Sequence, residues 1–435
     1  MDASVPERAG VGWVTEMRPS RLALGAVALL VACTGPSSGS GVAAQMPEQS
    51  PPRVTTLSDL GDRPRHLIEL MRDGPLKKRL EGCAALPLRR TRFSIGHRGA
   101  ARGFPEHTRE SYEAAARMGA GVIECDVTFT KDRKLVCRHS QCDLQATTNI
   151  LAVPALAAKC AAPFTPADPA TGKDASAKCC TSDVTLAEFE SLCGKMDGVD
   201  WRATSVADYI KGAPGAAAPS PVACGKVMSH AESIALIDGL GRAFTPELKT
   251  PSVAMPFEGD YTLERYAEQL VAEYRDARID PSRVFVQSTS RAVLAYLREH
   301  APDLARNAVY LDEEVGGARY DAAVAELPRL AAEGIHIVAP PMWALLTLDA
   351  QERIVPSRYA LAAKASGLDL VTFTFERAGS LEHGDSEDYR SVASAVTGEG
   401  DAYVLLDVLA RQVGLRGIFS DWPATVTYYA DCMGL

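Results

Sequence analysis

The sequence lacks both a surplus of basic residues and a long apolar run. Among its 435 residues, 46 Lys and Arg stand against 55 Asp and Glu, for a formal net charge of −9. A protein that binds nucleic acid by neutralising phosphates is normally basic over at least one domain, so no nucleic-acid partner is expected. A disordered chain is excluded too, because 46% of the residues are hydrophobic.

The apolar run near the N-terminus, residues 22–32, is too short to cross a bilayer. A helix of that length rises about 16 Å, roughly half of the hydrocarbon core. With arginines before it, the run predicts an export signal over residues 1–33. Its last residues and Cys33 also resemble the lipobox of bacterial lipoproteins, in which the cysteine is acylated. We therefore expect a periplasmic or extracellular protein, either secreted or attached to a membrane by a lipid on Cys33.

Pairs of the Cys-x-x-Cys kind are absent, although the chain has 11 cysteines. Because zinc sites usually use such pairs, disulfides are favoured over a thiolate metal site, and an oxidising compartment is implied. Acylation of Cys33 would leave ten cysteines, enough for five disulfides. Most of them lie between residues 125 and 224.

From about residue 93 onward, short apolar or β-branched runs alternate with helical patterns. This alternation is typical of βα units around a parallel sheet, and eight strands favour a (β/α)8 TIM barrel, an α/β fold. The expected strands cover residues 93–96, 122–127, 243–248, 283–287, 308–311, 335–339, 370–375 and 417–420. The expected helices cover residues 109–118, 263–277, 290–299, 322–332, 357–365 and 403–413.

One stretch, at about residues 141–227, breaks this alternation and is rich in Ala, Pro, Gly, Ser and Cys. We predict that it is a cysteine-rich, disulfide-linked insertion after the second strand unit of a barrel spanning residues 91–430. Cys125 and Cys137 fall in the expected barrel wall, where they could remain free buried thiols. Residues 34–90 are expected to form a linker or arm with one helix near 66–80.

Charged side chains gather at the carboxyl ends of the expected strands, where barrel enzymes keep their active sites. Glu124 and Asp126 lie two residues apart in a strand and therefore point to the same face. Two carboxylates so close repel unless a cation lies between them, and hard oxygen ligands suit Ca²⁺ or Mg²⁺. Glu247 could supply a third carboxylate, and Lys249 could bind an anion beside the metal. Any one of these charged residues could be an ordinary surface or core residue. Their occurrence in this order on consecutive strands favours a functional site.

A set of motifs in this order resembles the glycerophosphodiester phosphodiesterase family. The motifs are His97-Arg98-Gly99, Pro105-Glu106-His107-Thr108, Glu124-Cys125-Asp126-Val127, Val136-Cys137-Arg138-His139, Pro246-Glu247-Leu248-Lys249 and Ser420-Asp421-Trp422-Pro423. The resemblance covers residues from about 91 to 425 and implies a TIM barrel, in agreement with the strand count. It departs from the family pattern at His107, which replaces Asn, and at Ser140, which follows His139 where Asp is common.

The resemblance also implies the roles of the site residues. His97 and His139 would be the acid/base pair, and one divalent cation, Ca²⁺ before Mg²⁺, would be held by Glu124, Asp126 and Glu247. The phosphate and the glycerol would be contacted by Arg98, Lys249, Gln287 and Phe375. The missing Asp after His139 could change how that imidazole is oriented.

The implied activity is metal-dependent hydrolysis of a small-molecule glycerophosphodiester, such as glycerophosphocholine, to glycerol 3-phosphate and an alcohol. Two alternatives stay open. One is a lysophospholipase D or sphingomyelinase D-like enzyme on the same barrel, and the other is a phosphoester-binding protein without turnover.

Overall fold

The structure is a computed structural model that describes residues 60–86, 88–212, 220–377, 381 and 387–435. The predicted export signal and Cys33 lie outside the described residues. Among the described residues, no helix has the length and apolar character needed to span a bilayer.

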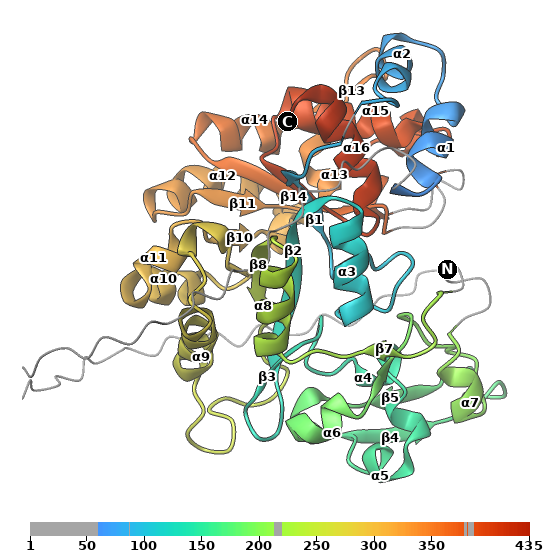
Figure 1. The fold of residues 1–435 in the computed structure, drawn as a ribbon, viewed down its shortest axis with the longest axis vertical. Helices are drawn as coiled ribbons and strands as arrows, with labels where there is room; N and C mark the ends of the chain where they lie inside the picture. The colour runs from blue at the N-terminus through green and yellow to red at the C-terminus, as the bar shows by residue number, and fades with distance from the viewer. Residues whose placement is uncertain (1–59, 87, 213–219, 378–380, 382–386) are drawn as a thin grey trace, which may run out of the picture. The chain divides into compact units, whose positions relative to one another are not determined.

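Eight parallel strands form a closed barrel (Figure 1), which confirms the predicted fold. They follow the order β1-β15-β14-β11-β10-β9-β8-β2, and β1 pairs with β2 to close the ring. The strands are β1 (Thr91–Gly96), β2 (Ala120–Phe129), β8 (Ala243–Leu248), β9 (Gln287–Ser288), β10 (Val309–Leu311), β11 (Ile337–Ala339), β14 (Asp369–Phe375) and β15 (Gly417–Ser420). Only β9 is displaced from its expected range, residues 283–287. Within that expected range, Val284 forms a single β-bridge with Phe244.

The barrel interior is packed with apolar side chains from alternate strand positions. A buried cluster there consists of Ile95, Val122, Ala243, Val309, Leu311, Ile337, Ala339, Val371 and Phe419. The opposite face of each strand packs against the helices, because successive side chains of a strand point to opposite faces. The polar residues at the carboxyl ends of the strands therefore lie next to a tightly packed apolar barrel interior.

The helices around the barrel include all the predicted ones and two longer additions, although the helix expected over residues 403–413 is α-helical only to Asp407 and is a π-helix from Val408 to Val413. They are α3 (Arg109–Arg117), α8 (His230–Gly239), α9 (Leu263–Asp276), α10 (Arg291–His300), α12 (Tyr320–Ala332), α14 (Arg358–Ala365), α15 (Asp401–Asp407) and α16 (Pro423–Met433). The additions are α8 and α16. Almost every residue of α16 is buried, so it has no polar stripe whose period would predict a helix.

The insertion lies between β3 (Leu135–Cys137) and α8. Its elements are α4 (Leu144–Thr147), α5 (Pro154–Ala157), β4 (Ala162–Thr165), β5 (Ser176–Lys178), α6 (Leu186–Glu190), β6 (Cys193–Gly194), α7 (Val206–Tyr209) and β7 (Gly225–Lys226). It has a small apolar core of its own that includes Phe189 and Tyr209. Three disulfides tie these short elements together, namely Cys142–Cys180, Cys160–Cys179 and Cys193–Cys224. The predicted cysteine-rich insertion is thereby confirmed.

The segment before the barrel contains two helices, α1 (Arg63–Leu70) and α2 (Pro75–Gly82), where one was expected. Pro75 is the reason, because it starts a helix well but disfavours helical backbone at the residue before it. α1 packs on α15 and α16 (Figure 1). The Cys83–Cys432 disulfide joins this segment to α16, and the Arg63 Nε atom lies 2.6 Å from Glu376 Oε1 at the end of β14.

The expectation that Cys125 and Cys137 remain free thiols is wrong. They form a disulfide between β2 and β3, and all ten cysteines of the described residues are paired. Strand β3 runs antiparallel to β2 at the barrel rim, with Val127 opposite Cys137. Both sulfurs face the packed side of the rim, since Cys125 and Cys137 are buried in the main core.

Candidate active site

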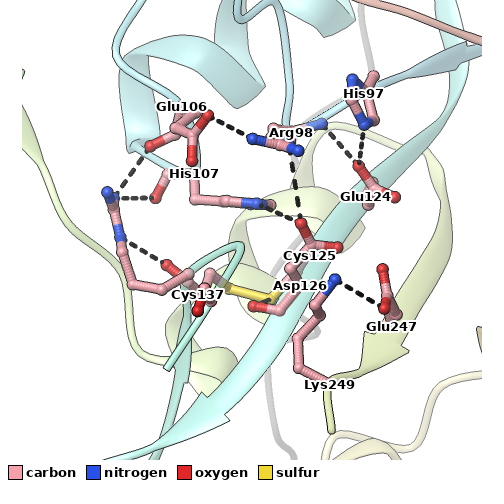
Figure 2. Close-up of polar contacts among 12 residues, drawn as sticks. His97, Arg98, Glu106, His107, Glu124, Cys125, Asp126, Cys137, Glu247 and Lys249 are labelled. Atoms are coloured by element: carbon pink, nitrogen blue, oxygen red, sulfur yellow. Dashed lines mark hydrogen bonds and ion pairs between the residues drawn. A yellow bond between two sulfur atoms is a disulfide. The ribbon is translucent and has the colours of Figure 1, made fainter. Parts of the chain in front are cut away.

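Three buried carboxylates meet at the carboxyl ends of β2 and β8. Glu124 and Asp126 point from alternate positions of β2, and Glu247 on β8 pairs in register with Asp126. One carboxylate oxygen from each of the three residues lies within 4.8 Å of the other two. Their residues are 4%, 1% and 6% exposed. The regular alternation of β2 thus produces the acidic cluster that the sequence predicts (Figure 2).

The charges of this cluster are not balanced by the protein alone. Burial and the neighbouring Asp126 carboxylate raise the pKa of Glu124 well above its usual range. Burial also raises the pKa of Glu247 to about 8, although Lys249 opposes that shift. At Asp126, His107 and Lys249 outweigh burial and hold the pKa well below its usual range. One ionised carboxylate therefore lies beside two that favour the protonated form unless a cation joins them.

The cluster fits a divalent cation. Asp126 Oδ1 is buried without a hydrogen-bond partner among the described residues, so one oxygen is free to serve as a ligand. The remaining contacts orient the set: Glu124 accepts hydrogen bonds from Gln287 Nε2 at 2.7 Å and from the Arg98 backbone N–H at 2.8 Å. Carboxylate oxygens held from behind in this way are typical of sites for hard cations.

His97 follows β1 and is held by a carboxylate. Its Nδ1 atom donates to Asp421 Oδ1 at 2.5 Å, so Nε2 is directed toward Glu124 Oε2 at 3.8 Å. Burial lowers the pKa of His97, and Asp421 works against that shift. Asp421 stands directly after β15, the strand next to β1. The sequence motif contains Asp421, but no spacing rule identified it as the partner of His97.

His139 follows β3 and has no such partner. Its ring makes no hydrogen bond to any described residue. Burial and the positive charges of Arg98 and Lys249 lower its pKa to about 2, against the opposing pull of Asp126. The ring nevertheless lines the same cavity as His97, so the predicted pair of histidines is brought together.

Arg98 is fixed from several sides. Its Nη1 atom donates to Glu106 Oε2 at 2.8 Å, and Nε lies 3.8 Å from Asp126 Oδ2 (Figure 2). Although burial opposes ionisation, Glu106 and Asp126 raise the pKa of Arg98, so its charge is secure. A positive backbone φ of 54° at Arg98 accompanies the turn that directs its N–H to Glu124. The guanidinium is thus a permanent cation beside the carboxylates.

Sequence reasoning missed a buried layer behind these residues. His107 contacts Asp126 Oδ2 through Nε2 at 3.0 Å and the Tyr112 hydroxyl through Nδ1 at 3.0 Å. Arg138 donates to the backbone carbonyls of Glu106 and Cys137, both at 2.9 Å. The one available signal was His107 itself, which departs from the family pattern and contacts Asp126, a candidate metal ligand.

A cavity of about 100 Å³ joins the site residues. It is lined by eight of the predicted residues, His97, Arg98, Glu124, Asp126, His139, Glu247, Lys249 and Gln287. Phe375 is not among them, because it is completely buried in the main core. A register shift in β14 between Thr372 and Phe375 separates these positions, and Phe373 lines the cavity in place of Phe375.

The insertion reaches the edge of the site through one ionic bridge. Arg377 Nη1 lies 3.2 Å from Asp421 Oδ2, and its Nη2 lies 3.1 Å from Asp197 of the insertion. Because Asp421 also holds His97, a chain of contacts links the insertion to that histidine. No sequence signal pointed to this contact, since Asp197 and Arg377 are far apart along the chain.

A parallel barrel that gathers carboxylates, fixed cations and two imidazoles at its carboxyl end has the layout of an enzyme acting on an anionic substrate. Residues 97–425 match the glycerophosphoryl diester phosphodiesterase family. The chain belongs to this family of phosphodiester-hydrolysing enzymes.

Three individual proteins show what the chain is similar to. An Arthroderma benhamiae protein described as an extracellular protein is 47% identical over 248 residues, which are 55% of this chain and 100% of that protein. The Bacillus subtilis glycerophosphodiester phosphodiesterase is 48% identical over 57 residues, or 13% of this chain and 19% of its own length. A Silicibacter pomeroyi structure described as a glycerophosphoryl diester phosphodiesterase shares the fold, with 23% identity, a TM-score of 0.51, and coverage of 82% of this chain and 98% of that one.

Proposed function

We propose that the protein hydrolyses glycerophosphodiesters such as glycerophosphocholine to glycerol 3-phosphate and a free alcohol. The observation that carries this proposal is the shared cavity, in which His97 and His139 stand with Arg98 and Lys249 beside three buried carboxylates. A phosphodiester requires neutralisation of its negative charge together with one proton acceptor and one proton donor. This set of side chains supplies all three.

The phosphate would bind against Arg98 and Lys249. Both are fixed by carboxylates, with Lys249 Nζ at 2.8 Å from Glu247 Oε1, so little reorganisation would accompany binding. Glu124, Asp126 and Glu247 would hold one divalent cation, which when bound would neutralise further charge on the phosphate oxygens. A cage of three carboxylates favours Ca²⁺ over Mg²⁺, because Mg²⁺ usually keeps several waters and takes one or two carboxylates.

His97 is the candidate base. Asp421 fixes the Nδ1–H tautomer and would stabilise the imidazolium that forms when Nε2 takes a proton from the attacking oxygen. That oxygen belongs either to water or to the glycerol hydroxyl next to the ester.

His139 is the candidate acid. Burial, together with the positive charges of Arg98 and Lys249, lowers its pKa to about 2. An anionic phosphate bound between those cations would offset their effect and raise the pKa of His139, so that the ring carries a proton for the departing alkoxide when substrate is present.

We also propose that the protein is exported. The five disulfides of the described residues and the description of the Arthroderma benhamiae relative as an extracellular protein support this proposal. Acylation of Cys33 stays a prediction. Labelling with a palmitate analogue tests it, and label that survives the Cys33→Ser substitution would contradict it.

The test of activity is alcohol release from purified protein. We expect choline from glycerophosphocholine, loss of turnover on chelation, and recovery with Ca²⁺ better than with Mg²⁺. His97→Ala and His139→Ala should each lower kcat/KM by about 10³-fold, the range of a lost general acid or base. His300→Ala is the matched control, because His300 is an exposed histidine stacked on Tyr296 outside the cavity.

The same assay separates the alternatives. Faster choline release from lysophosphatidylcholine than from glycerophosphocholine would favour a lysophospholipase D. Wild-type protein as inactive as both alanine variants over a panel of diesters would leave only a phosphoester-binding protein.

A further inference from the structure

His139 raises a question of position. A general acid must be held within a few tenths of an ångström of its working place, and a misplacement of 1 Å can lower the rate about 10²-fold. His97 is held by the Asp421 carboxylate, but no described residue makes a hydrogen bond to the His139 ring. The position of His139 must therefore come from its backbone.

The hydrogen-bonded ladder between β2 and β3 ends before it reaches His139. Its pairs are Phe129 with Leu135, Thr128 with Val136 and Val127 with Cys137, and they stop two residues short. Beyond them, one backbone hydrogen bond joins Arg138 N–H to Asp126 O at 2.7 Å. On its other side, β3 is bonded to the segment before α8 through Cys137 N–H to Met228 O at 3.1 Å and through a bridge between Val136 and Ser229, and these contacts also end before His139. The ends of paired strands open more easily than their centres, so the position of His139 depends on what holds the last paired residues of β3.

The Cys125–Cys137 disulfide holds the last of these paired residues, Cys137, to β2. Cys125 lies between the two carboxylate residues of β2, Glu124 and Asp126, with its sulfur on the opposite face. Cys137 lies two residues before His139, and its carbonyl accepts a hydrogen bond from Arg138 Nε. Figure 2 shows the sulfur–sulfur bond close to Asp126.

We propose that the Cys125–Cys137 disulfide is a positioning element of the active site, which holds His139 in place against the carboxylate cluster. The proposal rests on the proposed function, in which His139 is a catalytic group. In the chain-entropy view, a disulfide stabilises a fold more when it closes a longer loop. The Cys125–Cys137 bond joins residues that are 12 apart in the sequence, whereas Cys83–Cys432 joins residues that are 349 apart. Closing so short a loop contributes comparatively little to the stability of the fold, so the importance of Cys125–Cys137 lies in its position beside the active site.

The test compares two disulfide deletions of similar loop length. Cys125→Ala/Cys137→Ala removes the bond at the site, and Cys160→Ala/Cys179→Ala removes a bond of 19-residue separation inside the insertion. We expect the first variant to lose about 10- to 100-fold in kcat for glycerophosphocholine with KM nearly unchanged, because position and not binding is lost. The second should keep kcat within about twofold, since it leaves that position intact.

Two outcomes would overturn the proposal: full kcat in the first variant, or an equal loss in both. If the first variant does not fold, Cys125→Val/Cys137→Ala, which refills part of the lost volume, is measured in its place and is judged by the same outcomes. Near-ultraviolet circular dichroism verifies that each protein is folded.

A second readout does not depend on turnover. In histidine-labelled protein, the His139 ring should give one narrow NMR signal in the wild type and in the insertion variant, and a broadened or split signal in the site variant. An unchanged signal would contradict the inference. An inactive wild type with the expected change in the signal would instead contradict the proposed function alone.

Discussion

His97 and His139 share one cavity but are held in different ways. His97 follows the barrel strand β1, with Asp421 bound to one ring nitrogen and Glu124 facing the other. His139 stands on the antiparallel rim strand and depends on a disulfide, on Arg138 and on its backbone. The comparison indicates that a side-chain hydrogen bond can hold an imidazole ring directly. A ring without such a bond is positioned by its backbone and by the disulfide behind it.

The largest effect is expected from removing the side-chain support of His97. Asp421→Asn cannot stabilise an imidazolium by charge, so kcat for glycerophosphocholine should fall by about 10²-fold. Asp303→Asn, which alters an exposed ion pair with Arg275, is the matched control. A loss of less than about threefold would mean that the charge of Asp421 contributes little to turnover.

The next effect concerns the cation. Gln287→Ala removes the hydrogen bond that Glu124 Oε1 accepts from Gln287. Because Glu124 also faces the His97 ring, this substitution changes the part of the site next to His97. We expect the dissociation constant for Ca²⁺, measured by calorimetry, to rise by about 10- to 100-fold, the usual effect of losing support behind a metal ligand. Unchanged affinity would show that Glu124 needs no such support.

A smaller effect is expected from the insertion. Asp197→Asn weakens the bridge through Arg377 to Asp421. Because Asp197 is exposed, kcat/KM should fall by only about two- to fivefold. Asp208→Asn elsewhere in the insertion is the control, and an equal effect there would exclude a specific route to His97.

A separate effect lies on the His139 half and concerns stability instead of turnover. Burial raises the pKa of Asp143, which accepts a hydrogen bond from Ser140 N–H at 2.9 Å, to about 7. An acid with a raised pKa binds its proton more tightly in the folded state, so its contribution to stability is present below pH 4 and is lost as pH rises to about 7.

Asp143→Asn should remove this dependence. Relative to wild type, the variant should gain on the order of 1–2 kcal/mol in the free energy of unfolding between pH 5 and pH 8, reduced from the full shift by partial exposure. Denaturant unfolding at both pH values measures the gain. Equal differences at the two values would mean that Asp143 keeps an ordinary pKa.

The sequence predicted what depends on short-range periodicity. The eight strands and the positions of Glu124, Asp126 and Glu247 follow from alternation along a strand, which is a local rule. Asp421, Arg377 and Asp197 could not be found in this way, because their contacts with the site join segments that are remote along the chain. Phe375 was misplaced for a related reason: a register shift in β14 changes which side of the strand a residue faces, and no residue pattern announces it.

The Cys83–Cys432 bond has a consequence for the covalent topology of the molecule. It fastens the segment before β1 to the helix after β15, and these two strands are neighbours in the barrel. The backbone from residue 83 to residue 432 is therefore a closed ring that contains the whole barrel and its insertion. A single protease cut anywhere in that ring opens it without releasing a fragment, so the protein could be nicked once and remain one molecule.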